Sequence, residues 1–340
     1  MNFKKKNSHT TSSALRQMIV RVKRKSIFTS DTTRSDGQRT VSMRESVSSK
    51  KPGISKKDIS GWLIMLPTIL LFAFFVWEPL GESVRLSLYT AKGIRLQEFV
   101  GFHNYALVFN HPDFWAAFKN TFTYILWSLI IGFFTPIIMA VLITETVHLK
   151  SLFKIGVYFP NIMPGMAMVM MWGFFFRPGN TGVLNILLSK LGIDSMVWLT
   201  NPKLTIPLIV ATMTWKGAGS TALIYMAGIN GINPELYEAA TLDGAGIRQR
   251  IRFITLPNIF SLGKTLLILQ VITVFQILYE PLVMTNGGPN NRSISIMQLV
   301  FNYAFRDYNY PAAAALSVMI CIVLVILSAI YFKLTKSKEN

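Results

Sequence analysis

The segment 230–257 holds the largest set of residues whose types and spacing could serve a function. It opens with Asn-Pro-Glu at residues 233–235, a strong helix start, because Asn caps free amides, Pro suits the first turn and Glu complements the helix dipole. We predict a short helix from there to Asp243, and Gly244 permits a left-handed stop. A second short helix should follow and end at residues 256–257, which read Leu-Pro.

Two short helices joined at a glycine form a compact knob, and we use that name for residues 233–257. Its chemistry is docking rather than catalysis, because the small side chains of Ala239 and Ala240 would let a partner surface approach closely. The second helix carries isoleucines on one side and arginines around the rest: Ile247, Ile251, Ile254, Arg248, Arg250 and Arg252. The alternative interpretation is an amphipathic helix pair that rests on anionic lipid through its arginines.

Metal and nucleophilic chemistry find little support in the sequence. The four histidines are scattered without metal-ligand spacing, and the single cysteine, Cys321, lies within an apolar run. The sequence has no Gly-x-x-x-x-Gly-Lys-Ser/Thr loop that could cradle nucleotide phosphates. We therefore predict a protein that is not an enzyme, with no catalytic residue, no metal site and no cofactor of its own.

The composition places these residues in a membrane protein. Of the 340 residues, 51% are hydrophobic and only 15% are charged, whereas roughly a quarter of the residues of a soluble protein are charged. Six apolar stretches are each long enough to cross about 30 Å of hydrocarbon as a helix: 61–81, 117–143, 153–176, 204–229, 259–284 and 311–332. The predicted fold class is therefore an all-α polytopic membrane protein, with its transmembrane domain at 58–335. Several spans contain proline, which favours a translocation path, although proline is also common in simple membrane helices.

Much of the formal charge of +18 belongs to the N-terminal tail. Residues 1–57 are rich in Ser, Thr, Lys and Arg, so we predict a disordered basic tail in the cytosol, with a transit peptide as the alternative. Basic residues beside the spans favour a cytosolic location for both termini. Between the third and fourth spans, apolar residues from Leu184 to Leu191 predict a short helix at the membrane surface that stops at Gly192.

The knob resembles the EAA loop of the permeases of ATP-binding-cassette (ABC) importers. Seven positions carry the resemblance and keep the spacing of that loop: Glu238, Ala239, Ala240, Gly244, Ile254, Leu256 and Pro257. The resemblance extends over about residues 58–335, and the tail falls outside it. Softer matches favour the binding-protein-dependent carbohydrate permeases, related to the maltose-type permease, and they include Gly61-Trp62, Phe159-Pro160, Gly182-Val183-Leu184-Asn185 and Thr285-Asn286-Gly287-Gly288-Pro289.

The resemblance implies a division of labour between several subunits. The chain would pair with a second permease to enclose the path, and two cytosolic ATPase subunits would dock onto the knobs and use the ATP. An extracytoplasmic binding protein would deliver a sugar substrate from outside. The complex would lie in the lipid of a bacterial or archaeal cell membrane. No nucleic-acid partner is expected, because the basic tail lacks interleaved aromatic residues.

Sugars are usually held by polar groups beside aromatic faces, and the spans contain seven residues of these types: Trp172, Thr214, Trp215, Gln270, Gln276, Tyr279 and Glu280. Each could instead serve helix packing or interfacial anchoring. The alternative function is an ion-coupled secondary solute transporter, which should place carboxylates in the middle of the membrane and show related halves. Glu280 lies close to the outer end of its predicted span, and no internal repeat is evident.

Overall fold

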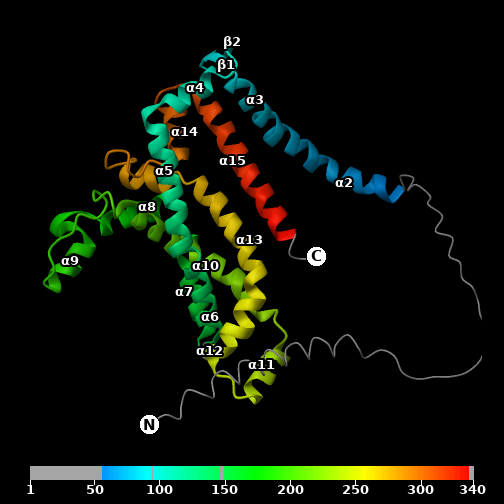
Figure 1. Cartoon of the computed structure of the whole chain (residues 1–340), viewed down its shortest axis with the longest axis vertical. Coiled ribbons are helices and arrows are strands. Elements are labelled where there is room, and N and C mark those ends of the chain that lie inside the picture. Colours follow the sequence, from blue (N-terminus) through cyan, green and yellow to red (C-terminus); the bar gives the residue numbers. More distant parts are fainter. Residues whose placement is uncertain (1–55, 94, 146–148, 337–340) are drawn as a thin grey trace, which may run out of the picture. The chain divides into compact units, whose positions relative to one another are not determined.

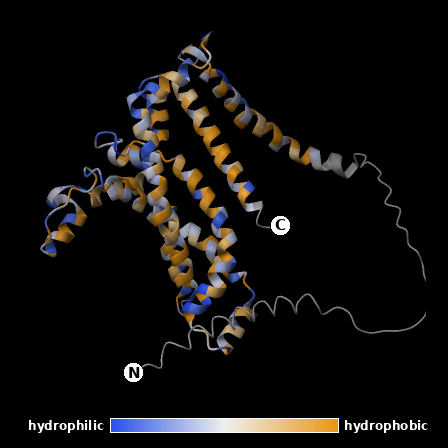
Figure 2. Cartoon of the chain, in the orientation of Figure 1, coloured by the Kyte–Doolittle hydropathy of each residue, from blue (hydrophilic) through white to orange (hydrophobic). Residues whose placement is uncertain are grey.

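A computed structural model describes residues 56–93, 95–145 and 149–336 of the chain (Figure 1). The predicted tail, 1–57, lies almost wholly outside these residues. The chain divides into two compact units, Met1–Ile64 and Met65–Asn340. The described residues are mostly helical, and the long helices are coloured hydrophobic over much of their length, as expected in a membrane protein (Figure 2).

The all-α prediction is wrong in one place, because a β-hairpin follows the first long helix. β1 (Tyr89–Lys92) pairs antiparallel with β2 (Arg95–Phe99), and Tyr89 lies opposite Phe99. Gly93 opens the turn with a φ of +63°, which glycine adopts without steric cost. Strands of four and five residues are too short for apolar periodicity to reveal them.

Two long helices form the first part of the membrane domain. The first consists of α2 (Lys56–Phe72), the π-turn η1 (Ala73–Trp77) and α3 (Glu78–Ser87), and its apolar part is Gly61–Ser87. The short α4 (His103–Asn110) leads to the second, which runs unbroken through Pro112–Glu145 as α5 (Pro112–Trp127), the π-turn η2 (Ser128–Gly132) and α6 (Phe134–Glu145). Both helices are longer than the predicted spans 61–81 and 117–143.

The third predicted span, 153–176, is not a single helix. α7 (Lys150–Ile162) and α8 (Gly165–Phe175) meet at a bend of 97°. Met163 and Pro164 are extended at the bend, because a proline disfavours helical geometry in the residue before it. After the short 3-10 helix η3 (Gly179–Thr181), α9 (Val183–Lys190) occupies the predicted short helix, and Gly192 follows with a φ of +71°. The prediction of that helix and its glycine stop is confirmed.

α10 (Thr205–Asn230) lies against several other helices, packing on α5, α6, α7 and α13. Its buried residues Ala222, Tyr225 and Met226 join one core cluster with α6, and Ile206, Ile209 and Val210 join a second with Tyr124 of α5. Among the described residues, four helices are long and apolar enough to cross a membrane, or five if the bent pair counts as one span. α10 is not among them, because it carries Lys216 and many small or polar residues on faces that its neighbours cover.

The knob consists of α11 (Pro234–Leu242), α12 (Ile247–Arg250), the π-turn η4 (Ile251–Thr255) and the first residues of α13 (Leu256–Phe275). The π-turn η5 (Pro281–Thr285), α14 (Ile296–Phe305) and α15 (Tyr310–Lys336) follow. The prediction that the second knob helix ends at Leu256-Pro257 is wrong, since the helix continues from Ile247 to Phe275.

The π-turn explains why Pro257 does not break this helix. The amide of Leu256 donates to the carbonyl of Ile251, five residues back, so the turn before the proline is wider than an α-helical turn. The wider turn accommodates a ring that would clash in a regular helix. Farther along, α13 ends at Phe275, so the helix stops short of the predicted span end at residue 284.

Candidate functional site

The first knob helix begins and ends as its sequence predicts. The side chain of Asn233 accepts a hydrogen bond of 3.0 Å from the amide of Glu235, and Pro234 occupies the first turn. The amide of Ala245 donates to the carbonyl of Ala240 at 2.8 Å, which closes the C-terminal turn. Gly244 has a φ of +76°, a conformation that a side chain would strain. Both the cap and the left-handed stop are confirmed.

One face of α11 packs onto the second knob helix. The Tyr237 hydroxyl lies 3.0 Å from the Thr255 hydroxyl, and an Arg250 guanidinium nitrogen donates to the Thr241 hydroxyl at 3.1 Å. Ala240 lies on this inner face and is only 7% exposed. The expectation that Ala240 meets a partner surface is therefore wrong, because the chain itself covers this side chain.

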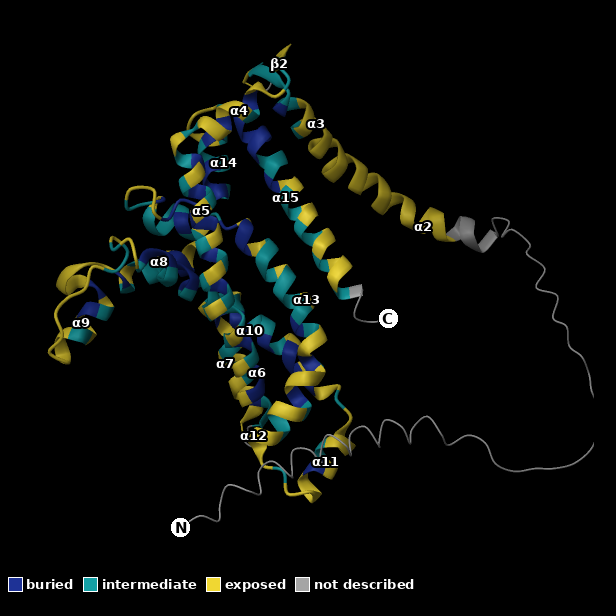
Figure 3. Cartoon of the chain, viewed as in Figure 1, coloured by how far each residue is buried: buried dark blue, intermediate teal, exposed yellow. Residues whose placement is uncertain are grey.

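The opposite face of α11 is open. Four exposed residues are spaced as neighbours on one side of this helix: Glu235, Glu238, Ala239 and Leu242. Figure 3 shows exposed positions along α11. Leu242 is 90% exposed, the highest value among the large apolar side chains of the described residues. An apolar side chain in this position at the end of a short helix, next to two carboxylates, is suited to enter a pocket on another protein.

Sequence reasoning missed Leu242. The signal was present, because Leu242 lies four residues after Glu238 and therefore shares its face. Of the other motif positions, Ile254 is half-buried, whereas Leu256 and Pro257 are exposed at the start of α13. The exposed outer face of α11 thus includes Glu235, Glu238, Ala239 and Leu242, and Gly244 follows it with its left-handed φ.

The three knob arginines have different surroundings. Arg250 is half-buried and lies 3.8 Å from a carboxylate oxygen of Glu145 at the end of α6. Arg248 and Arg252 are exposed, and the Arg252 guanidinium faces the ring of its neighbour Phe253 at 5.7 Å. Only two of the three arginines are therefore free to meet lipid headgroups.

The candidate sugar contacts divide among separate places. Trp172 of α8 and Trp215 of α10 lie edge to face at 5.6 Å, and the indole nitrogen of Trp172 is buried without a hydrogen-bond partner among the described residues. Lys216, half-buried on α10, follows Trp215 directly. Sequence reasoning missed Lys216, although a lone lysine inside an apolar helix is a functional signal.

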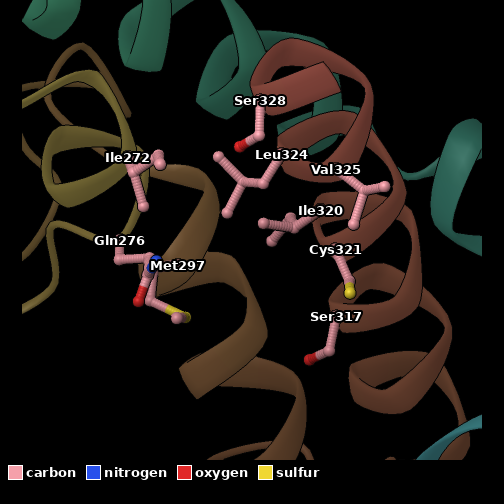
Figure 4. Close-up of a pocket in the computed structure, with 9 residues that line it drawn as sticks. All are labelled: Ile272, Gln276, Met297, Ser317, Ile320, Cys321, Leu324, Val325 and Ser328. Atoms are coloured by element: carbon pink, nitrogen blue, oxygen red, sulfur yellow. The ribbon is translucent and has the colours of Figure 1, made fainter. Parts of the chain in front are cut away.

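The remaining candidates lie elsewhere. Thr214 and Gln270 line a cavity of about 320 Å³ between α10, α13 and η2. The Gln270 amide donates to the hydroxyl of Ser128 at 2.6 Å and to its carbonyl at 2.8 Å, so it joins two helices. Gln276 lines a different, mostly apolar cavity of about 440 Å³ between α13, α14 and α15 (Figure 4), and Tyr279 is 59% exposed.

Comparison with known proteins places this geometry in a family. Residues 137–337, which include the whole knob, match the family model of binding-protein-dependent transport system inner membrane components. A probable ABC transporter permease protein of Pyrococcus horikoshii is 30% identical, over 79% of this chain and 94% of its own length. The lactose transport system permease protein LacF of Rhizobium radiobacter is 28% identical, over 83% of this chain and 96% of its own.

A solved structure of an ABC transporter is also similar to this chain. A chain from a bacterial ABC transporter involved in the import of the acidic polysaccharide alginate superimposes with a TM-score of 0.74, at 28% identity, over 83% of this chain and 96% of its own. The protein therefore belongs to the inner-membrane components of binding-protein-dependent transport systems. It is a multi-pass ABC transporter permease, and not the ATPase, so the resemblance found in its sequence is confirmed. The ion-coupled secondary transporter is excluded as its function.

Proposed function

We propose that the protein is one of two permeases that enclose a path for a sugar or oligosaccharide, with two ATPase subunits docked on their knobs. The exposed face of α11 carries the proposal, because it presents an apolar anchor between acidic side chains on a helix that is fixed at both ends. The relatives named for lactose and alginate transport support a saccharide as the cargo. The pair Trp172 and Trp215 is the proposed aromatic wall of the path.

The cargo class and the knob are tested together in the native cell. Deleting the gene should abolish uptake of a saccharide from a panel of neutral and acidic oligosaccharides, and the wild-type gene should restore it. Gly244→Val should restore only about a tenth of wild-type uptake, because a side chain at this φ costs about 1–2 kcal/mol, enough to lower the population of the docking shape by about tenfold. Gly246→Ala is the matched control, since Gly246 has an ordinary φ of −70°. Unchanged uptake of every saccharide in the deletion strain would contradict the proposal.

We further propose six spans, with the bent pair α7 and α8 as the third, α10 as the fourth and both termini in the cytosol. Single cysteines in a Cys321→Ser background test this topology. Lys190→Cys and Asn290→Cys, both at exposed positions, should react with a membrane-impermeant reagent in intact cells. Arg248→Cys in the knob should react only after permeabilisation. If α7 and α8 instead formed a re-entrant loop, Lys190→Cys would be protected and Arg248→Cys would react from outside.

A further inference from the structure

Arg250 connects three elements that are separate in the sequence. Its guanidinium contacts Glu145 at the end of α6 and Thr241 on α11, while its backbone ends α12. The Arg250 and Glu145 side chains are 24% and 28% exposed, so water screens their interaction less than that of a surface pair. In the part of the chain that the structure describes, the other ion pair joins Arg85 to Glu82 within a single helix.

Glu145 occupies a position where a carboxylate is disfavoured. It is the last residue of α6, and the C-terminal end of a helix carries partial negative charge. Two cations offset this cost: Arg250 approaches the carboxylate, and the Lys150 ammonium donates to the neighbouring carbonyl of Thr144 at 2.8 Å. Helix propensity does not explain an acid at this position, whereas a contact with the knob does.

A second link joins the same two long helices farther from the knob. Gln270 of α13 donates to Ser128 at the start of η2, and η2 continues into α6. The helix that carries the knob is therefore attached to the second long helix at two points, one at the level of the knob and one farther along α13. Two attachments restrict the rotation of one helix about the other.

We propose that the ion pair of Arg250 and Glu145 is a positioning contact that holds the knob on the end of α6 and transmits its movement to the second long helix. This inference rests on the proposed docking of the ATPase to the knob. Arg250 lies on the inner side of the knob and Leu242 on its outer side. The pair therefore lies outside the proposed docking face, and substitutions in the pair should leave that face unchanged.

Charge reversal in the assembled transporter tests the pair. Glu145→Arg and Arg250→Glu should each lower uptake, and the stimulation of ATP hydrolysis by loaded binding protein, by about fivefold, the scale of a partly buried ion pair. The double variant Glu145→Arg/Arg250→Glu should recover to within about twofold of wild type, because the pair is restored with opposite polarity. Arg248→Glu is the matched control at an exposed position and should retain wild-type coupling.

Co-purification of the ATPase in detergent separates this inference from the proposed function. Single variants that retain the ATPase but lose stimulated hydrolysis support a positioning role. Full activity of both single variants, or a double variant no better than either, would overturn it. Release of the ATPase from Arg250→Glu would also count against it, by assigning Arg250 to docking. An ATPase that fails to bind the wild-type knob would instead refute the proposed function.

Discussion

Replacing Leu242 by Asp should remove the ATPase subunits from the transporter while leaving the permease folded. Leu242 is 90% exposed, so the fold gains almost nothing from it. Truncating an apolar anchor in a protein interface typically costs about 2 kcal/mol or more, and a buried carboxylate costs still more. We expect uptake to fall by at least about thirtyfold, with the amount of permease in the membrane unchanged.

The controls for this experiment lie at the same position. Leu242→Met keeps the apolar volume and should retain uptake and a bound ATPase, because Leu and Met exchange readily in packed sites. Leu242→Ala should fall between the two. The measurements are uptake in cells and the amount of ATPase that co-purifies with the permease. An Asp variant with a stably bound ATPase and normal uptake would show that this face of α11 is not the docking surface.

Replacing Gly219 by Ala should destabilise the permease itself. A Cβ atom at this position of α10 would lie 1.8 Å from the backbone carbonyl oxygen of Val157 on α7, so the two backbones meet where only glycine fits. The helices must separate to admit a methyl group, and we expect a loss of about 2–3 kcal/mol in the free energy of unfolding. A lower membrane level and a lower unfolding temperature in detergent would report it.

Gly217 provides the matched control on the same helix. A Cβ atom there meets nothing within 4 Å, so the methyl group of the Gly217→Ala variant causes no steric clash. Because Ala favours helix over Gly by about 1 kcal/mol, this variant should be as stable as wild type or slightly more stable. Equal stability of Gly217→Ala and Gly219→Ala would contradict the close approach of α10 and α7.

Local signals in the sequence predict the start and stop of the first knob helix. The Asn233 side chain caps the helix by accepting from the amide of Glu235, and Gly244 ends the helix through its own positive φ. Neither feature depends on distant residues. The burial of Ala240 could not be predicted in this way, because it depends on the rotation of α11 against η4. The same limit applies to Arg250, which contacts a residue more than a hundred positions away in the sequence.

The spans show the same division between local and tertiary causes. Hydropathy locates the long apolar helices, since their lipid-facing side chains must be apolar. The bend between α7 and α8 depends on Pro164, whose presence indicates a break but not its angle of 97°. At η4 the backbone hydrogen bonds change from the α-helical spacing of four residues to a spacing of five. This change has no simple sequence signal, because a π-turn differs from an α-turn by a single residue.

Because the knob continues through η4 into α13, the number of residues in the EAA-like motif fixes the rotation of the knob relative to α13. Each residue of an α-helix turns the chain by about 100°, so removing one residue between Arg250 and Pro257 would rotate everything before the deletion by that angle. Leu242 would then point along a different azimuth around the axis of α13, and Arg250 would face away from Glu145. The number of residues in this segment therefore sets the rotation of the outer face of α11 relative to the membrane-spanning part of α13.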